Sequence, residues 1–310
     1  MCNYPFDEPI LMIWQTERCV MLGNNQIVDA EINRNFAERE NIQIVRRSSG
    51  GGTIFCDMGT LLYTIILPYN HDEDTQKLAR EKVAPPIVSA LNDMGISALI
   101  EGRNDILVDG KKVSGIAQYA KSGRVCTHGS LLFDTDLEML TNVLNVDAEK
   151  ISSKALKSVR SRVANLREYI TEDCATIEFL EMLKQRLFSA LELREVKLSE
   201  EQLTEIDKIF NEKYGNSEWT FERSPKFTLK NGKRFSGGRV DVYLDVARGV
   251  VKSCAIRGDF LGISPIRELE EAFEGRMFDR QTFTDALDGI SLLPYLGSIT
   301  KDELLSCVFE

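Results

Sequence analysis

Three consecutive glycines, Gly50, Gly51 and Gly52, stand between the polar run Arg46–Ser49 and the apolar stretch Thr53–Phe55. Glycine loses more backbone entropy on folding than any other residue, so a run of three is costly unless the fold or a ligand needs it. One interpretation is a tight hairpin or bulge. The other is a loop that presents several backbone N–H groups to one anion. The spacing matches neither the phosphate loop of nucleotide hydrolases nor the dinucleotide fingerprint, and both interpretations stay open.

The composition limits the classes of protein to which the chain can belong. At 310 residues it is long for one core, and one large plus one small domain are expected. No apolar run approaches the roughly 20 residues of a membrane span, and the amino terminus carries no secretory signal, so we expect a cytoplasmic protein without membrane contact. The net charge of −10 argues against nucleic-acid binding. The seven dispersed cysteines lack metal-ligand or redox spacing, which favours reduced thiols.

Hydrophobic periodicity and turn residues predict an α+β chain. Strands are predicted at 10–14, 19–22, 42–45, 61–67, 106–108, 112–113, 131–133, 240–246 and 250–256, and helices at 29–41, 74–94, 137–144, 176–193, 200–214 and from 264 onward. Asp109-Gly110 is a favoured hairpin turn, Asn231-Gly232 is expected to fold the segment 227–235 back on itself, and Arg248-Gly249 is expected to turn into the last strand. The stretch Trp219–Pro225 is expected to connect two domains, at 1–220 and 226–310.

Three polar segments could carry chemistry. Asn104 and Asp105 stand at a strand start, where their oxygens could hold Mg²⁺ or where Asp105 could simply cap a turn. Lys112, one hairpin away, is either a solvated side chain or a compact positive charge beside a phosphate or carboxylate. His128 precedes an apolar strand and is either a hydrogen-bonded structural residue or an acid or base.

A cluster of basic residues lies between the two helical regions of the chain. Its members are Lys154, Lys157, Arg160, Arg162 and Arg167. They form either a solvated linker face or a loop that closes over a nucleotide.

Taken in order, these segments resemble those of the lipoate-protein ligase family. The matching motifs are Arg46–Gly52, Gly102–Asp105, Lys112–Gly115, His128-Gly129 and Ser158–Arg162, followed by Glu218-Trp219, Pro225, Gly238–Val246 and Gly258–Phe260. Their order over nearly the whole chain is far more specific than any single motif. The resemblance implies a mixed-sheet α+β catalytic domain, related to biotin ligases and class II aminoacyl-tRNA synthetases, and a small α+β accessory domain at the carboxyl end.

The resemblance also implies a reaction in two steps. Lipoate carboxylate attacks the α-phosphate of ATP to give lipoyl adenylate and pyrophosphate, and an acceptor lysine then attacks the adenylate and releases AMP. ATP with Mg²⁺ is therefore expected as a cofactor. The expected acceptors are the lipoyl domains of 2-oxoacid dehydrogenase complexes or the glycine-cleavage H protein, and the enzyme itself is expected to be a monomer.

By position in the resemblance, Lys112 is the expected catalytic residue, because its charge would stabilise developing negative charge on phosphate and carbonyl oxygens. The expected ATP and adenylate contacts are Arg47, Gly52, Thr53, Ile54, Phe55, Asn104, Asp105 and Lys112. The expected lipoate contacts are Gly51, Gly52, Lys112 and His128, with Ile54 and Phe55 near the apolar tail. Asp105 is the expected Mg²⁺ ligand.

The chain departs from the family pattern at three places. Cys56-Asp57 stands where the family commonly has His-Asp, Thr60 replaces a frequent asparagine, and the family's first strand and helix are expected to be missing before Pro9. Two rival functions remain. One is an octanoyl or lipoyl transferase of the same fold with a cysteine nucleophile, for which Cys56 and Cys126 are the candidates, and the other is a non-catalytic lipoate-binding relative. Biotin ligation is disfavoured because its Gly-Arg-Gly-Arg pattern is absent.

Overall fold

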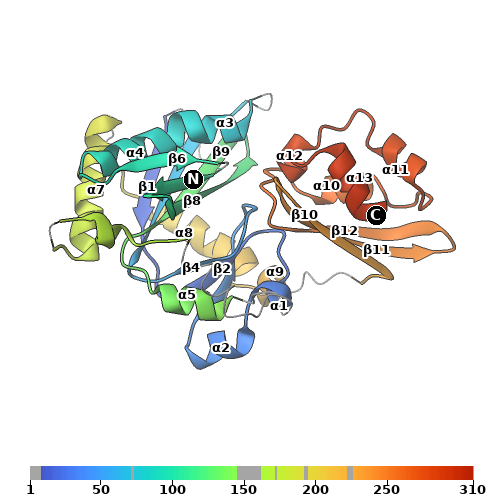
Figure 1. The fold of residues 1–310 in the computed structure, drawn as a ribbon, viewed down its shortest axis with the longest axis horizontal. Helices are drawn as coiled ribbons and strands as arrows, with labels where there is room; N and C mark the ends of the chain where they lie inside the picture. The colour runs from blue at the N-terminus through green and yellow to red at the C-terminus, as the bar shows by residue number, and fades with distance from the viewer. Residues whose placement is uncertain are drawn as a thin grey trace. The chain divides into compact units, whose positions relative to one another are not determined.

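The structure is a computed structural model, and it describes residues 8–70, 73–102, 104–144, 162–171, 173–191, 195–221 and 226–309. The chain divides into two compact units, shown as a ribbon in Figure 1. The larger unit consists of Met1–Val20, Ile32–Ile44 and Ile54–Phe210, and the smaller of Met21–Glu31, Val45–Thr53 and Asn211–Glu310. The glycine loop is therefore grouped with the carboxyl-terminal part of the chain. The predicted domain boundary between residues 220 and 226 stays a prediction.

The larger unit is built on a six-stranded sheet of order β1-β5-β9-β8-β7-β6. Its strands are β1 (Ile10–Trp14), β5 (Thr60–Pro68), β6 (Ala98–Glu101), β7 (Asp105–Val108), β8 (Lys111–Lys121) and β9 (Arg124–Leu132). Every neighbouring pair is antiparallel. For β6–β7, β7–β8 and β8–β9 this follows from the short connections, because tight hairpin turns can join only antiparallel strands. Asp109 and Gly110, at φ of 49° and 73°, form the predicted turn between β7 and β8.

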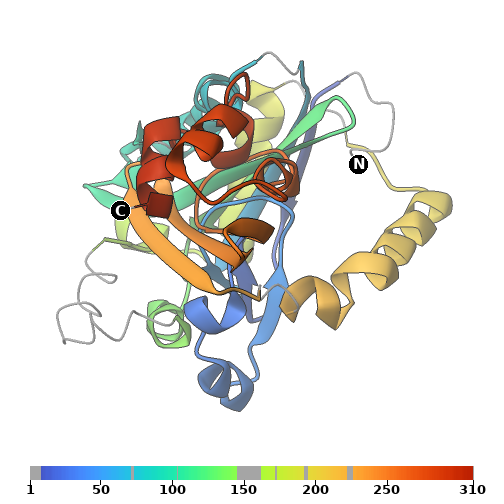
Figure 2. The same ribbon diagram turned by 90° about the vertical axis from the view of Figure 1, so that its right-hand side faces the viewer.

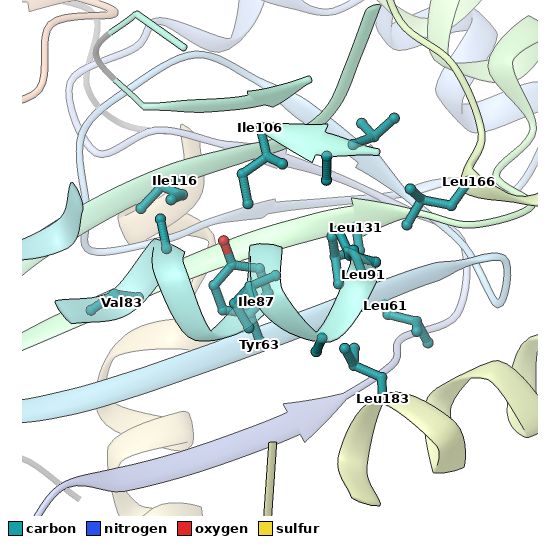
Figure 3. Close-up of a cluster of buried hydrophobic side chains, with 14 of the residues drawn as sticks. Leu61, Tyr63, Val83, Ile87, Leu91, Ile106, Ile116, Leu131, Leu166 and Leu183 are labelled. Carbon is teal, nitrogen blue, oxygen red and sulfur yellow. The ribbon is translucent and has the colours of Figure 1, made fainter. Parts of the chain in front are cut away.

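Helices cover one face of this sheet and close the core. They are α3 (Thr75–Leu78), the π-helical segment η1 (Ala79–Val83), α4 (Ala84–Asn92), η3 (Leu166–Tyr169) and α7 (Thr176–Ala190). Two further helices of the same unit are α5 (Leu137–Val143) and α8 (Glu200–Ile209), and α8 has no buried residue. Pro85 and Pro86 occupy the first turn of α4, where their missing N–H groups cost least. Figure 3 shows Ile87 and Leu91 of α4 over Tyr63 of β5, and all three are at most 1% exposed. The core therefore lies between α4 and the sheet.

A three-stranded sheet of order β3-β2-β4 leads to the glycine loop. Its strands are β2 (Cys19–Leu22), β3 (Gln43–Arg46) and β4 (Ile54–Cys56), and α1 (Val28–Glu31) and α2 (Arg34–Arg39) lie between β2 and β3 in the chain. The single helix predicted at 29–41 is thus two short helices. Asn33 caps the second of them, because its side chain accepts the N–H of Phe36.

The carboxyl-terminal module is a three-stranded sheet with helices on one face, visible in Figures 1 and 2 as orange strands and red helices. Its strands are β10 (Leu229–Phe235), β11 (Gly238–Ala247) and β12 (Val250–Gly258). Its helices are α10 (Arg267–Glu271), α11 (Arg280–Ala286), α12 (Leu293–Leu296) and α13 (Lys301–Phe309), and the π-helical segment η4 (Phe210–Tyr214) and α9 (Ser217–Phe221) precede the module. Buried aliphatic and aromatic residues of both layers form its core. The predicted turn Arg248-Gly249 is confirmed by positive φ at both residues.

Three local predictions were wrong. Asn231-Gly232 lies inside β10, and the chain turns instead between Phe235 and Gly238. Position 232 favours glycine because a Cβ on Gly232 would lie 2.1 Å from Oδ1 of Asp241 on the paired strand. His128 lies within β9 rather than before a strand. Trp219 belongs to α9 rather than to an irregular connector.

Candidate active site

Lys112 lies at the start of β8, where a β-bulge changes the direction of its side chain. The pairing with β7 shifts between Ile106 and Leu107, so Leu107 faces Lys112 while Ile106 faces Ser114. A bulge of this kind re-aims a side chain without ending the strand. The main chain of Lys112 is also held from the other side, because its N–H donates to the carbonyl of Arg162 at 2.7 Å and its carbonyl accepts the N–H of Ala164.

The side chain of Lys112 crosses Gly115 to reach Asp105. Gly115 is the cross-strand partner of Asp105, and a Cβ on it would lie 2.9 Å from Nζ of Lys112. Nζ forms an ion pair with Asp105 at 2.7 Å from Oδ1, a buried oxygen for which the described residues supply no hydrogen bond. The Lys-x-x-Gly spacing thus has a physical reason, since any side chain at position 115 would occupy the path of the lysine.

Both members of the Lys112–Asp105 pair are about one third exposed, so the pair is worth little as a source of stability. Its value lies in placement. A carboxylate that fixes the ammonium in one position leaves two of its three N–H donors directed elsewhere. The geometry is therefore that of a preorganised cation at the surface of a sheet.

Asn104 and His128 are held in different ways. The side-chain amide of Asn104 donates to the main-chain carbonyl of Ile116 at 2.9 Å, and the main-chain carbonyl of Asn104 accepts the N–H of Ile116. Asn104 therefore ties β8 to the start of β7. His128 of β9 pairs with Thr64 and Ala117, and by strand alternation it lies on the same face as Ser130, the partner of Gly115. The structure thus brings Asn104, Asp105, Lys112 and His128 to one region of one sheet.

The glycine loop belongs to the smaller unit, and its three glycines differ in backbone conformation and surroundings. A Cβ on Gly50 would lie 2.5 Å from the carbonyl oxygen of Phe260, so the backbone approaches too closely for a side chain. Gly51 has a φ of 87° and donates its N–H to the same oxygen. Gly52 is exposed, lacks positive φ, and has no atom within 4 Å of a Cβ built on it. Gly52 therefore keeps open space beside the backbone, whereas Gly50 does not.

Two arginines shape this loop. The guanidinium of Arg46 is buried and donates to the carbonyl oxygens of Gly23, Asn24, Gln26 and Thr220. Arg47 donates to the carbonyls of Met21, Gly50 and Gly52 and to the hydroxyl of Ser49. Neither arginine stands out from the loop as a lone charge. Most of the loop is thus a braced turn, while the presentation of its N–H groups to an anion stays a prediction.

Replacing the two glycines separates these roles. We expect Gly50→Ala to lower the stability by about 1–3 kcal/mol, because its methyl group meets a backbone carbonyl that cannot move aside. We expect Gly52→Ala to keep or slightly raise the stability and to raise the KM for ATP about tenfold, since it fills open space at the loop surface. Thermal unfolding and ATP titration of both variants measure this. Equal effects of the two substitutions on stability would contradict it.

The remaining predicted residues have mixed surroundings. Thr53 of the loop donates its hydroxyl to Oε1 of Gln26, Ile54 is half-buried in β4, and Phe55 is 1% exposed. Such burial makes Phe55 part of a core rather than an open surface. Cys56 and Cys126 are also buried. A buried thiol is a poor nucleophile, which weakens the transferase alternative.

The basic segment is described only in part. Ser158 and the residues Lys154, Lys157 and Arg160 lie outside the described residues, as does Pro225. Arg167 has a structural role, because it donates to the carbonyl of Cys174 and forms an ion pair with Asp173 at 2.7 Å. Whether this segment forms a solvated linker face or closes over a nucleotide stays a prediction.

Sequence reasoning missed the side chains that brace the loop from outside. Trp219 donates its indole N–H to the carbonyl of Arg46, and Tyr214 and Lys213 both contact the hydroxyl of Ser48. Nζ of Lys213 also lies 3.9 Å from the centre of the Trp219 ring, a cation–π contact. The only signal available was the Glu218-Trp219 match to the family pattern.

Comparisons with known proteins identify the family. The model of the lipoyl protein ligase A/B catalytic domain matches residues 2–188, and that of the bacterial lipoate protein ligase C-terminus matches 224–308. The chain is 36% identical to lipoate-protein ligase LplJ of Bacillus subtilis, over 98% of this chain and 92% of that one. It is 34% identical to lipoate–protein ligase 1 of Staphylococcus aureus over 98% and 92%. The chain belongs to the lipoate-protein ligase family and is an enzyme of the ligase class.

Solved structures agree with the predicted fold class. Plasmodium falciparum LipL1 in complex with lipoate has a TM-score of 0.75 at 23% identity, covering 97% of this chain and 85% of that one, which shows a common fold. The bipartite ligase of Thermoplasma acidophilum, described with its E2 lipoyl domain, scores 0.64 at 28% identity over 72% and 88%. A lipoate-protein ligase A bound with ATP scores 0.58 at 25% identity over 69% and 86%. The α+β assignment is confirmed.

Two further findings concern metals and membranes. In the described parts of the chain, no group of three or more histidine, cysteine, aspartate or glutamate side chains could hold a metal ion. A search of the same residues finds no helix with the length and apolar character to cross a membrane.

Proposed function

We propose that this chain activates lipoate with ATP to form lipoyl adenylate and then transfers the lipoyl group to a lysine of an acceptor domain, acting as a monomer. The observation that carries the proposal is the Lys112–Asp105 contact across Gly115, which holds one ammonium group in a defined position. Family membership and the ATP-bound and lipoate-bound relatives support the choice of substrates.

In the first step, Lys112 would act by its fixed charge. As the lipoate carboxylate attacks the α-phosphate, negative charge develops on the phosphate oxygens and moves onto pyrophosphate. An ammonium held by Asp105 needs little reorganisation to stabilise that charge. In the second step, the same charge would stabilise the oxyanion formed when the acceptor amine attacks the carbonyl of the adenylate. No covalent bond to the enzyme is needed.

The other proposed contacts follow from their surroundings. Gly52 leaves its backbone accessible to ATP, and Arg47 holds the carbonyls of Gly50 and Gly52 so that the loop keeps its shape. Thr53 and Ile54 continue this stretch toward the adenylate, with Phe55 packed behind them. Gly51 and His128 are proposed to contact lipoate.

A divalent cation fits the donors in one arrangement only. Mg²⁺ is usually bound by one or two carboxylates together with substrate phosphates. Asp105 supplies one carboxylate, and its Oδ1 is already next to Lys112. Asp105 would therefore hold Mg²⁺ only as part of the ATP complex, where the ion would neutralise phosphate charge.

The proposed acceptors are lipoyl domains of 2-oxoacid dehydrogenase complexes or the glycine-cleavage H protein, in line with the archaeal relative described with its E2 lipoyl domain. The test is intact-mass measurement of a purified lipoyl domain after incubation with the enzyme, lipoate and ATP. We expect a lipoyl adduct that requires ATP and is absent when the acceptor lysine is replaced by arginine. An adduct that forms without ATP would overturn the ligase assignment and favour a transferase.

A further inference from the structure

Gln26, a residue outside every predicted site, holds both ends of the glycine loop. Its side chain is 1% exposed, and Oε1 accepts the N–H of Gly23 at 2.8 Å and the hydroxyl of Thr53 at 2.9 Å. Its main-chain carbonyl accepts Nη1 of Arg46 at 2.6 Å. Gly23 in turn packs against Gly51, because a Cβ on it would lie 2.0 Å from the carbonyl oxygen of Gly51. One buried amide thus links the turn before α1 to the far end of the loop.

The orientation of this amide is determined by chemistry. A backbone N–H can only donate, so the atom of Gln26 that faces Gly23 must be the carbonyl oxygen. The Thr53 hydroxyl, whose hydrogen can rotate, must then donate its single hydrogen to the same oxygen. Consequently the lone pairs of the Thr53 hydroxyl remain for an N–H or O–H group of a ligand, whereas a phosphate oxygen would find no hydrogen there.

We propose that Gln26 is a positioning residue for ATP binding, which acts by fixing the Thr53 hydroxyl and the glycine loop. The inference rests on the proposed function, because it assigns the loop to ATP.

The chain offers a matched control for the test. Gln118 of β8 is also a buried glutamine bonded to a threonine hydroxyl, that of Thr127 at 2.8 Å, but it lies within the larger sheet. In lipoate-dependent ATP–pyrophosphate exchange, we expect Gln26→Met to raise the KM for ATP about tenfold with kcat within about twofold. Gln118→Met should lower the melting temperature comparably and leave the KM for ATP unchanged.

A second variant keeps the test valid if Gln26→Met fails to fold. Thr53→Val removes the hydroxyl but keeps the shape of the side chain, whereas Thr53→Ser keeps the hydroxyl. We expect Thr53→Val, but not Thr53→Ser, to raise the KM for ATP. Combining Thr53→Val with Gln26→Met should raise the KM no further than either variant does by itself, since both remove the same interaction. Additive effects, or a KM for ATP that neither variant changes, would overturn the role of Gln26.

If the parent shows no lipoate-dependent exchange at all, the proposed function fails. If the parent is active and Gln26→Met keeps its KM for ATP, the inference fails while the proposed function stands.

Discussion

We expect Lys112→Ala to lower the rate of lipoate-dependent ATP–pyrophosphate exchange about 10³-fold below that of the parent, because the substitution removes the ammonium held beside Asp105. The loss should appear in kcat, since the charge acts on groups that become more negative as the reaction proceeds. Thermal unfolding should change little, because the ion pair is partly exposed. Radiolabelled pyrophosphate exchange at saturating ATP measures the effect.

Lys111 provides the matched control for this prediction. It directly precedes Lys112 in the same strand, carries the same charge and is similarly exposed, whereas the ion pair with Asp105 is formed by Lys112. Lys111→Ala should therefore keep exchange within about threefold of the parent, the range expected when an exposed charge is removed. Equal losses in the two variants would show that general positive charge, rather than the placement of Lys112, supports the reaction.

Gly129→Ala should be the most destabilising single methyl group in the larger sheet. A Cβ on Gly129 would lie 2.3 Å from the hydroxyl oxygen and 2.4 Å from Cζ of Tyr63, whose ring is buried in the core shown in Figure 3. The ring cannot move without displacing its neighbours, so we expect a loss of about 3 kcal/mol or more in the free energy of unfolding. Urea denaturation measures it.

Gly115→Ala is the companion experiment on the neighbouring strand. There the new methyl group meets only the flexible end of the Lys112 side chain, at 2.9 Å from Nζ and 3.0 Å from Cε. We expect a folded protein of nearly unchanged stability, in which the displaced ammonium lowers kcat about 10²-fold. A destabilisation similar to that of Gly129→Ala would contradict the distinction between the two glycines.

Patterns with local causes could be predicted from the sequence. Asp109-Gly110 and Arg248-Gly249 both turn as expected, with positive φ at all four residues. Aspartate and glycine tolerate such angles, and in the second pair the tolerant residue is Gly249. Asn231-Gly232 is an equally good pair by composition and does not turn. Its glycine is required by Asp241 across the sheet, a contact between strands that a local pattern cannot reveal.

The same limit applies to the candidate site. The sequence motifs, compared with the family pattern, pointed to Lys112, Asp105 and the glycine loop, and the structure confirms that Lys112 and Asp105 lie together. The sequence could not reveal why Gly115 follows Lys112 by three residues, because the reason depends on a bulge. Nor could it reveal Gln26, whose partners Gly23 and Thr53 lie 3 and 27 residues away and are united only by folding.

The most direct test of the proposed function is pyrophosphate release by the parent enzyme without any acceptor protein. We expect a single burst of about one pyrophosphate per enzyme, dependent on both ATP and lipoate, because a water-excluding site retains the adenylate. Mass spectrometry of the denatured enzyme should find lipoyl adenylate but no covalent adduct. Pyrophosphate release without lipoate, or a lipoyl group bound to a cysteine, would contradict adenylate-forming ligation.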